Sequence, residues 1–248
     1  FALDCHNQGV SPGPDRWLEH VRRLSRRGPT DDPLKFWRRV TTGFALAGLV
    51  AGTLAMLGLL FYDGGQRINL TVILAFVLLQ CILAVVTTVQ AFAGWQPWRW
   101  LLRKFAVARH SGALRTLQPL LMARAAHTGG LAFGVAGLIT LLVLVVIQDL
   151  AFGWSTTLNT GTDSYYRMLS AIATPWQHLW PAAMPDRELV DATRFFRSQS
   201  STTTDPALWG SWWPFVAMVW MIYVVLPRLA LLVVAIVHPH MRARKALR

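Results

Sequence analysis

The chain has 248 residues, of which 54% are hydrophobic and 15% are charged, and its formal net charge is +12. This composition predicts long continuous apolar runs and argues against a soluble protein built around an amphipathic core. The alternating pattern of membrane β-barrel strands is absent. No nucleic-acid-binding signature accompanies the basic residues, so we interpret the charge as a membrane-surface feature and expect no nucleic-acid partner.

Four apolar windows, 41–62, 68–94, 129–148 and 211–237, are long enough to cross a bilayer, which takes about 20 helical residues. None contains an acidic residue, and only the fourth contains a basic one. The sequence therefore predicts an all-α integral membrane protein with four transmembrane helices. In chain order we expect a first transmembrane hairpin over 41–94, a third span over 129–148 and a fourth span over 211–238.

Two segments outside the spans have the pattern of basic amphipathic helices, which lie on a membrane surface or bind a partner. The first is the N-terminal segment 1–40, with a helix expected over 15–27. The second is the loop 95–128, where Ser111 and Gly112 separate two expected helices. The residues of this loop expected to face anionic lipid or a partner are Arg99, Arg103, Lys104, Arg109 and Arg115.

Glycine spacing in the first and third spans predicts close helix packing. Small residues four apart let transmembrane helices approach each other. The expected packing residues are Gly43, Gly48, Gly52, Gly130 and Gly134, and Ala47 and Ala51 continue the stripe that begins at Gly43. Two interpretations stay open, because these residues can pack the chain's own helices together or can contact another subunit.

The connection over 149–210 is too long for a turn, and its pattern predicts a small helical cap outside the membrane. Asp163 is expected to cap a first helix and Asp186 a second. The link between them is rich in Pro and Trp, which suits a rigid cap resting on the outer leaflet.

The fourth span contains a proline followed at once by an arginine. Pro227 lacks an amide hydrogen, so we expect it to free the carbonyl of Tyr223 and bend the helix. The Arg228 guanidinium has five donors and no carboxylate in any span. Its acceptors are freed carbonyls or polar side chains of the bundle, lipid phosphate, or a group on a partner, and we expect Arg228 to face protein. The candidate side-chain acceptors are Thr87, Gln90 and Thr140.

The distribution of Lys and Arg predicts the orientation, because these residues are retained on the cytoplasmic side. The segments 1–40, 95–128 and 239–248 hold 18 of them, whereas the two other connections hold five. We therefore expect both termini to be cytoplasmic, the cap to be periplasmic, and 239–248 to be a basic tail in contact with the anionic inner leaflet. Since the chain begins at Phe1 rather than Met, we expect it to be part of a longer polypeptide.

Several stretches resemble one known family. They are DGGQRINLTVILAFVLLQ opening the second span, FGWSTTLNTGTDSYYRML after the third, MPDRELVDATR in the outer connection and WMIYVVLPRLALLVV in the fourth. Together they resemble the bacterial membrane family catalogued as domain of unknown function 2868. The resemblance implies no established activity, but members of this family are commonly encoded beside a GTPase-like protein, which makes such a protein a candidate partner. The outer motif residues are Trp154, Thr156, Thr157, Pro185 and Asp186.

Motifs of catalysis and metal binding are missing from the sequence: it has no phosphate-binding Gly-Lys loop, no Gly-x-Ser-x-Gly, no His-Glu-x-x-His and no Cys-x-x-Cys. We expect no catalytic residue, no metal site and no cofactor. The predicted function is a non-catalytic subunit of the bacterial inner membrane that anchors or scaffolds other membrane subunits or a GTPase-like partner. The alternative is a small channel or transporter component, although the spans lack carboxylates and inverted repeats. A remote alternative is a b-type haem between His127 and His238.

Overall fold

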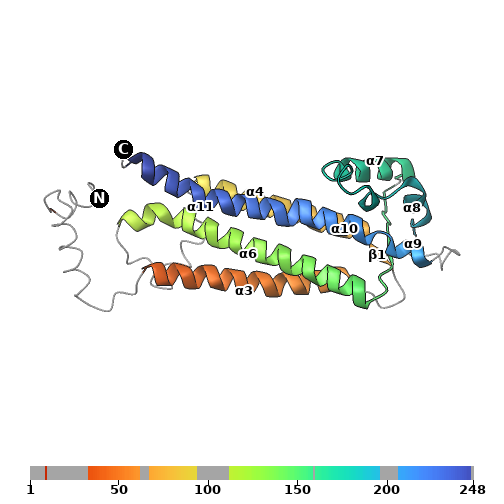
Figure 1. Cartoon of the computed structure of the whole chain (residues 1–248), viewed down its shortest axis with the longest axis horizontal. Helices are drawn as coiled ribbons and strands as arrows, with labels where there is room; N and C mark the ends of the chain where they lie inside the picture. The colour runs from red at the N-terminus through yellow and green to blue at the C-terminus, as the bar shows by residue number, and fades with distance from the viewer. Residues whose placement is uncertain are drawn as a thin grey trace.

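The protein is mostly helical, and four of its helices are long and apolar enough to cross a membrane. The computed structural model describes residues 9, 33–61, 67–93, 112–158, 160–195 and 206–246. The candidate spans are Lys35–Leu59, Leu70–Ala91, Gln118–Ile147 and Ala207–Val237, and they lie side by side in an elongated bundle (Figure 1). The expectation of an all-α, multi-pass membrane protein is confirmed at this level.

The first three spans are single unbroken helices rich in Leu, Val and Ala. Their bounds are α3 Pro33–Leu59, α4 Leu70–Ala93 and α6 Gly112–Ile147. The structure differs from the expected boundary at residue 129, because α6 runs straight from Gly112 into the third span. Pro119, near its start, is the single proline in α6 and does not end the helix. The segment expected as a separate surface helix is therefore the first part of α6.

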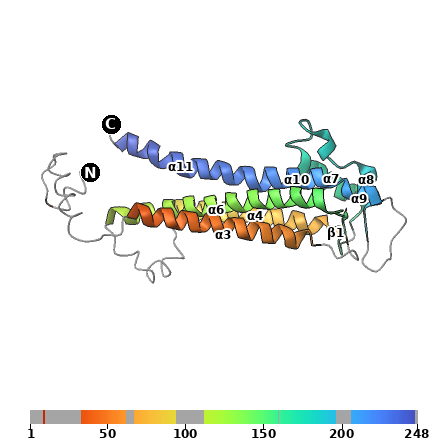
Figure 2. The same cartoon turned by 60° about the horizontal axis from the view of Figure 1, so that its bottom comes forward.

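The fourth span is built from three segments in direct succession. After the short helix α9 (Pro206–Gly210), α10 covers Trp213–Trp220, a π-helical turn η3 covers Met221–Val225, and α11 covers Leu226–Ala246. The start of α3 and the end of α11 lie at the same end of the bundle, opposite the segments that follow α6 (Figure 1). Beyond η3, α11 leans away from the other three helices (Figure 2).

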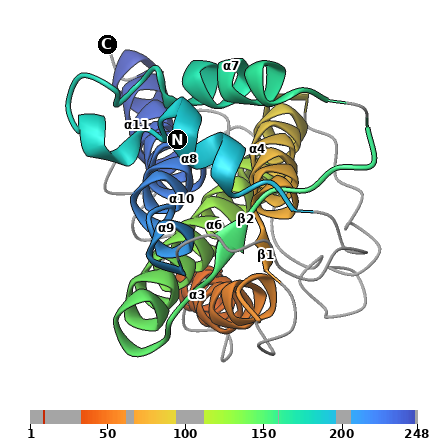
Figure 3. The same cartoon turned by 90° about the vertical axis from the view of Figure 1, so that its right-hand side faces the viewer.

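A small cap, residues 150–195, closes the other end of the bundle. Its two-stranded parallel sheet pairs β1 (Ile68–Asn69), before α4, with β2 (Phe152–Gly153), after α6. The helices α7 (Thr162–Ala173) and α8 (Arg187–Ala192) and the 3₁₀ turn η2 (Pro181–Ala183) complete it. Figure 3, which looks along the bundle from this end, shows α8 in front of the spans and α7 to one side, next to α4.

Of the two expected helix caps, one is present and the other is not. The Asp186 carboxylate accepts a hydrogen bond from the backbone N–H of Leu189 at 2.7 Å and so caps α8 as predicted. Asp163 does not cap α7, because the helix begins one residue earlier, at Thr162, with Gly161 in the cap position. The Asp163 carboxylate instead lies in the first turn, where its negative charge interacts favourably with the positive end of the helix dipole.

Aromatic side chains hold the cap to the fourth span. Trp154, Trp176, Trp212, Trp220, Phe152 and Phe215 are among the largest fully buried side chains. The Trp212 indole donates a hydrogen bond to the Thr193 hydroxyl at 3.1 Å, and the Tyr223 hydroxyl donates to the carbonyl of Ile172, in α7, at 2.9 Å. The core is therefore thickest where cap and bundle meet, while most exposed large apolar side chains lie on the outer faces of the spans, as lipid contact requires.

Glycines bring α6 close to helices on two sides. A Cβ at Gly48 or Gly52 of α3 would collide with the backbone of Gly129 or Phe133 of α6, respectively. Since both pairs advance in the same direction along the chain, α3 and α6 are parallel. On α6, Gly130 lies under Arg228 and Gly134 under Val224 and Val225. These four glycines pack the chain's own helices, whereas Gly43 has nothing within 4 Å of its Cβ position.

Candidate functional site: a buried arginine in the fourth span

The sequence Leu-Pro-Arg-Leu follows directly on the π turn η3. Pro227 cannot donate an amide hydrogen to the carbonyl of Tyr223, four residues earlier. In the structure, the Cys81 thiol of α4 donates a hydrogen bond to this carbonyl at 3.2 Å. The local widening of the helix and the missing donor thus create a polar contact between the fourth and second spans. π turns in helices are frequent at functional positions.

The Arg228 side chain is buried within the bundle, with 6% of its surface exposed. It lies against the backbone of Gly130: a Cβ built there would be 2.8 Å from the arginine Nε and 2.9 Å from its Cδ and Cζ. Any larger residue at this position would have to displace the guanidinium group. Gly130 therefore provides the space in which the arginine side chain crosses α6.

The side chains expected to accept hydrogen bonds from Arg228 do not do so. The Thr87 hydroxyl donates to the carbonyl of Leu83 at 2.6 Å, and the Thr140 hydroxyl donates to that of Ala136 at 2.8 Å. Threonine in a helix commonly bonds to the carbonyl four residues earlier in this way. Within the part of the chain that the structure describes, no hydrogen bond or ion pair joins the guanidinium to Gln90 or to any other residue.

His127 is a neighbour of the arginine that the sequence reasoning did not connect with it. Its ring is 2% exposed and lies one turn before Gly130 on the same face of α6. The ring Nε2 is 3.4 Å from the Thr88 hydroxyl oxygen, while Nδ1 is buried without a hydrogen-bond partner. The spacing of three residues between His127 and Gly130 was the available signal. The His238 side chain, the second expected haem ligand, lies outside the described side chains.

Arg228 brings a positive charge into an apolar part of the bundle. The guanidinium is close enough to act electrostatically on both the Cys81 thiol and the His127 ring. The acidic residues in the described part of the chain are Asp149 and four cap residues, all at the opposite end of the bundle. A desolvated cation without a counter-ion is costly in an apolar medium. This arrangement can bind an anion; in the described residues, no group of His, Cys, Asp and Glu is suited to hold a metal ion.

The motif residue Trp154 lies at the centre of the cap. Its ring stacks on Tyr165, with centroids 4.0 Å apart, and its indole donates a 2.6 Å hydrogen bond to the carbonyl of Val190. The Tyr165 hydroxyl lies 3.1 Å from that of Thr71 at the start of α4. Burial raises the pKa of Tyr165 to about 12, and the contact with Thr71 opposes this shift. Trp154 thus holds α7 and α8 together from inside.

The other motif residues support the cap backbone. The Thr156 hydroxyl accepts a hydrogen bond from the amide of Leu158 at 3.2 Å, and Thr157 is exposed. Pro185 is buried immediately before the helix cap. The sequence reasoning missed Asn69, whose side-chain amide donates to the carbonyl of Ser155 at 3.1 Å and so ties the motif to β1. These contacts are structural and contain no nucleophile paired with a base.

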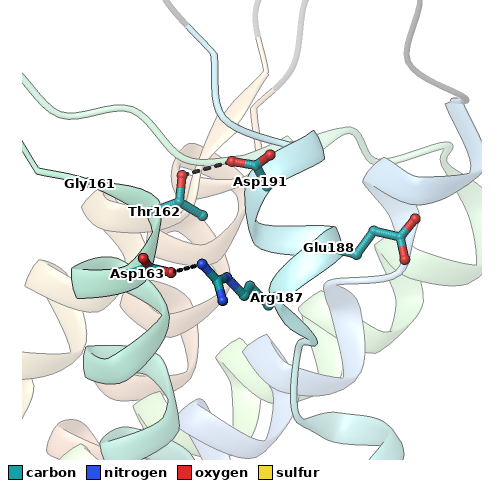
Figure 4. A pocket seen from close by; sticks show the side chains of 6 residues that line it. All are labelled: Gly161, Thr162, Asp163, Arg187, Glu188 and Asp191. Atoms are coloured by element: carbon teal, nitrogen blue, oxygen red, sulfur yellow. Dashed lines mark hydrogen bonds and ion pairs between the residues drawn. The ribbon is translucent and has the colours of Figure 1, made fainter.

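An exposed polar pocket lies between α7 and α8. Figure 4 shows two interactions across it: the Thr162 hydroxyl donates to the Asp191 carboxylate at 2.8 Å, and Arg187 forms an ion pair with Asp163 at 2.5 Å. The Glu188 side chain points away from both. The polar groups of the two pairs are satisfied by each other, so the pocket serves to hold α7 against α8.

The expected lipid-facing residues Arg99, Arg103, Lys104 and Arg109 lie outside the described residues, as do the helix expected over 15–27 and the Arg115 side chain, whereas residues 33–40 form the start of α3. On α6, Arg124 is described and exposed, one turn before His127.

A comparison with known protein families gives a match over most of the chain. A family model with the description Protein of unknown function (DUF2868) matches residues 83–248. The matched range includes His127, Gly130, Trp154 and Arg228, so the sequence resemblance to this family is confirmed. The search of curated proteins found no match, and neither did the search of solved structures.

Proposed function

Starting from the membership of this chain in the DUF2868 family, we propose that it is a non-catalytic integral membrane subunit that binds a helix of another membrane protein through the outer face of α3. The main support for this proposal is a stripe of small residues on that face, Gly43, Ala47 and Ala51, all of which are exposed. Small residues at this spacing allow another transmembrane helix to approach closely.

The position of α3 within the bundle supports this proposal. Among the described helices and strands, α3 packs almost wholly against α6, by way of Gly48 and Gly52. Its opposite face carries the exposed stripe together with the exposed side chains of Val50 and Leu54. In Figure 1, α3 lies at the edge of the bundle. A partner helix could therefore pack there without displacing a contact between the described helices.

We also propose that the cap faces the periplasm and that the opposite end of the bundle faces the cytoplasm of a bacterial cell. The excess of Lys and Arg in 1–40, 95–128 and 239–248 supports this orientation. On this proposal the basic segments contact anionic lipid of the inner leaflet, and a GTPase-like partner would bind at the same end. The helix partner at α3 and the partner at the basic end are separate binding events.

The test of the α3 interface compares two enlarging substitutions. Ala47 lies in the exposed stripe of α3, whereas Ala75 is an equally small exposed residue on α4. Ala47→Leu should release the partner and reduce the mass of the complex extracted from native membranes in mild detergent, while Ala75→Leu should leave the mass unchanged. A monomeric wild-type particle, or equal effects of the two substitutions, would contradict the proposal.

A further inference from the structure

Two buried side chains of the bundle, those of Arg228 and His127, lie close enough to interact electrostatically, and each has polar atoms for which the described residues provide no hydrogen-bond partner. These atoms are the guanidinium nitrogens of Arg228 and Nδ1 of His127. We call the region formed by Cys81, Thr88, His127, Gly130 and Arg228 the inner cluster. It lies in the matched family range except for Cys81, and it is independent of the exposed α3 stripe.

Arg228 defines one half of the ligand. Its planar guanidinium presents several N–H donors in a fixed fork that fits the oxygens of a phosphate or carboxylate. The group is 6% exposed, and the inner cluster contains no acidic residue. An anion would offset the charge of the arginine and satisfy its donors.

His127 defines the other half of the ligand. The Thr88 hydroxyl donates its hydrogen to the carbonyl of Ala84 at 2.8 Å, so its oxygen remains as an acceptor for His127 Nε2–H at 3.4 Å. In the neutral ring, a proton on Nε2 leaves Nδ1 as an acceptor. The ligand that completes this group must therefore donate a hydrogen bond, as well as accept hydrogen bonds from Arg228.

A phosphate group that retains one P–OH meets both requirements. Its charged oxygens accept from the guanidinium, and its hydroxyl donates to Nδ1. A phosphomonoester has a second pKa of about 6, so its singly ionised form is accessible near neutral pH. A carboxylate, a sulfate or a phosphodiester without a hydroxyl lacks the donor. We propose that the inner cluster binds such a phosphate, either on a lipid phosphomonoester or as free inorganic phosphate.

The route into the inner cluster follows the shape of the fourth span. η3 ends at Val225, and α11, which begins at Leu226, leans away from the other three helices toward its C-terminal end (Figure 2). Arg228 lies in the first turn of α11. The arginine therefore lies at the start of the helix that leans away from the bundle. A lipid headgroup from the leaflet at that end, or an anion from the adjoining solvent, would approach between α11 and its neighbours.

Two arms of one experiment distinguish the sources of the phosphate. Purified full chain is placed in phosphatidylcholine nanodiscs containing either phosphatidic acid or phosphatidylmethanol, a phosphodiester without a hydroxyl, and retained lipid is measured by native mass spectrometry. In phosphatidylcholine alone, the thermal midpoint is measured with inorganic phosphate or sulfate. In the first arm we expect at least tenfold more retained phosphatidic acid than phosphatidylmethanol if the phosphate is on a lipid. If it is free phosphate, the thermal midpoint in the second arm should rise with phosphate but not with sulfate. No preference in either arm would overturn the proposal.

Matched variants assign the binding to its residues. Arg228→Gln should reduce binding at least tenfold, whereas Arg124→Gln, which removes an exposed arginine one turn from His127, should leave it unchanged. His127→Leu should abolish the preference for the hydroxyl-bearing ligand. Equal losses of binding in the two arginine variants would show that the binding depends only on surface charge, and this would overturn the proposal. If Arg228→Gln does not fold, the wild-type arms and His127→Leu decide the outcome.

Discussion

The contact between α3 and α6 makes a quantitative prediction about Gly52. A Cβ at Gly52 would lie 2.9 Å from both the carbonyl carbon and the Cα of Phe133. Ordinary carbon–carbon contact is about 3.5–4.0 Å, so α3 must move away from α6 by roughly 1 Å. Because both clashing groups are backbone atoms, no side chain can rotate to relieve the overlap. Overpacking of this kind costs about 1–3 kcal/mol.

Gly43 is the matched control for Gly52→Ala. Replacing glycine by alanine in a helix gains up to about 1 kcal/mol from helix propensity, and this gain applies at both positions. Nothing lies within 4 Å of the Cβ position at Gly43, so Gly43→Ala keeps the gain without a clash. The free energy of unfolding should therefore be about 1–3 kcal/mol lower for Gly52→Ala than for Gly43→Ala. Dodecyl sulfate titration in mixed micelles, followed by far-UV circular dichroism, measures this difference; equal midpoints would refute the close α3–α6 contact.

Three further predictions concern the cap and the orientation. Trp154→Phe should cost about 1–3 kcal/mol, because the buried carbonyl of Val190 loses its 2.6 Å bond, and hydrogen exchange in α8 should accelerate. The raised pKa of Tyr165 contributes stability that is complete below pH 10 and is lost as the pH approaches about 12; Tyr165→Phe should weaken this dependence in near-UV circular dichroism. In intact cells, an impermeant thiol reagent should label a cysteine placed at Ser200 and spare one at Arg244, and the reverse pattern would invert the proposed orientation.

The spans were predictable because their evidence is local and abundant. Around twenty apolar residues in succession can satisfy their backbone in lipid as a helix, whatever the tertiary fold is. The start of α6 was placed too late, because the third span was expected to begin with the apolar run at Gly129. The helix in fact continues from Gly112 through Pro119 and Gly129 to Ile147. Composition marks the membrane region, and it does not mark where a helix begins.

The buried polar contacts could be predicted only in part. Pro227 predicts that the Tyr223 carbonyl lacks its helical donor, because α-helical hydrogen bonds join residues four apart and proline has no N–H. The replacement donor, Cys81, is 142 residues away in the chain and has no local signature. The same holds for Asn69, whose partner Ser155 is 86 residues away. Thr87 and Thr140 were plausible acceptors for Arg228 by depth alone, but each hydroxyl donates to its own helix, and within the described residues neither accepts a hydrogen bond from the guanidinium.

The role of the chain as a membrane subunit is tested most directly by a photocrosslinking side chain placed at Ala47. Irradiation of native membranes should give one dominant adduct with another membrane protein, identified by mass spectrometry, and the same side chain at Ala75 should give none. Both positions are small and exposed, and they lie on different helices, α3 and α4. Absence of an adduct at Ala47, or the same adducts at both positions, would contradict a partner helix at the outer face of α3.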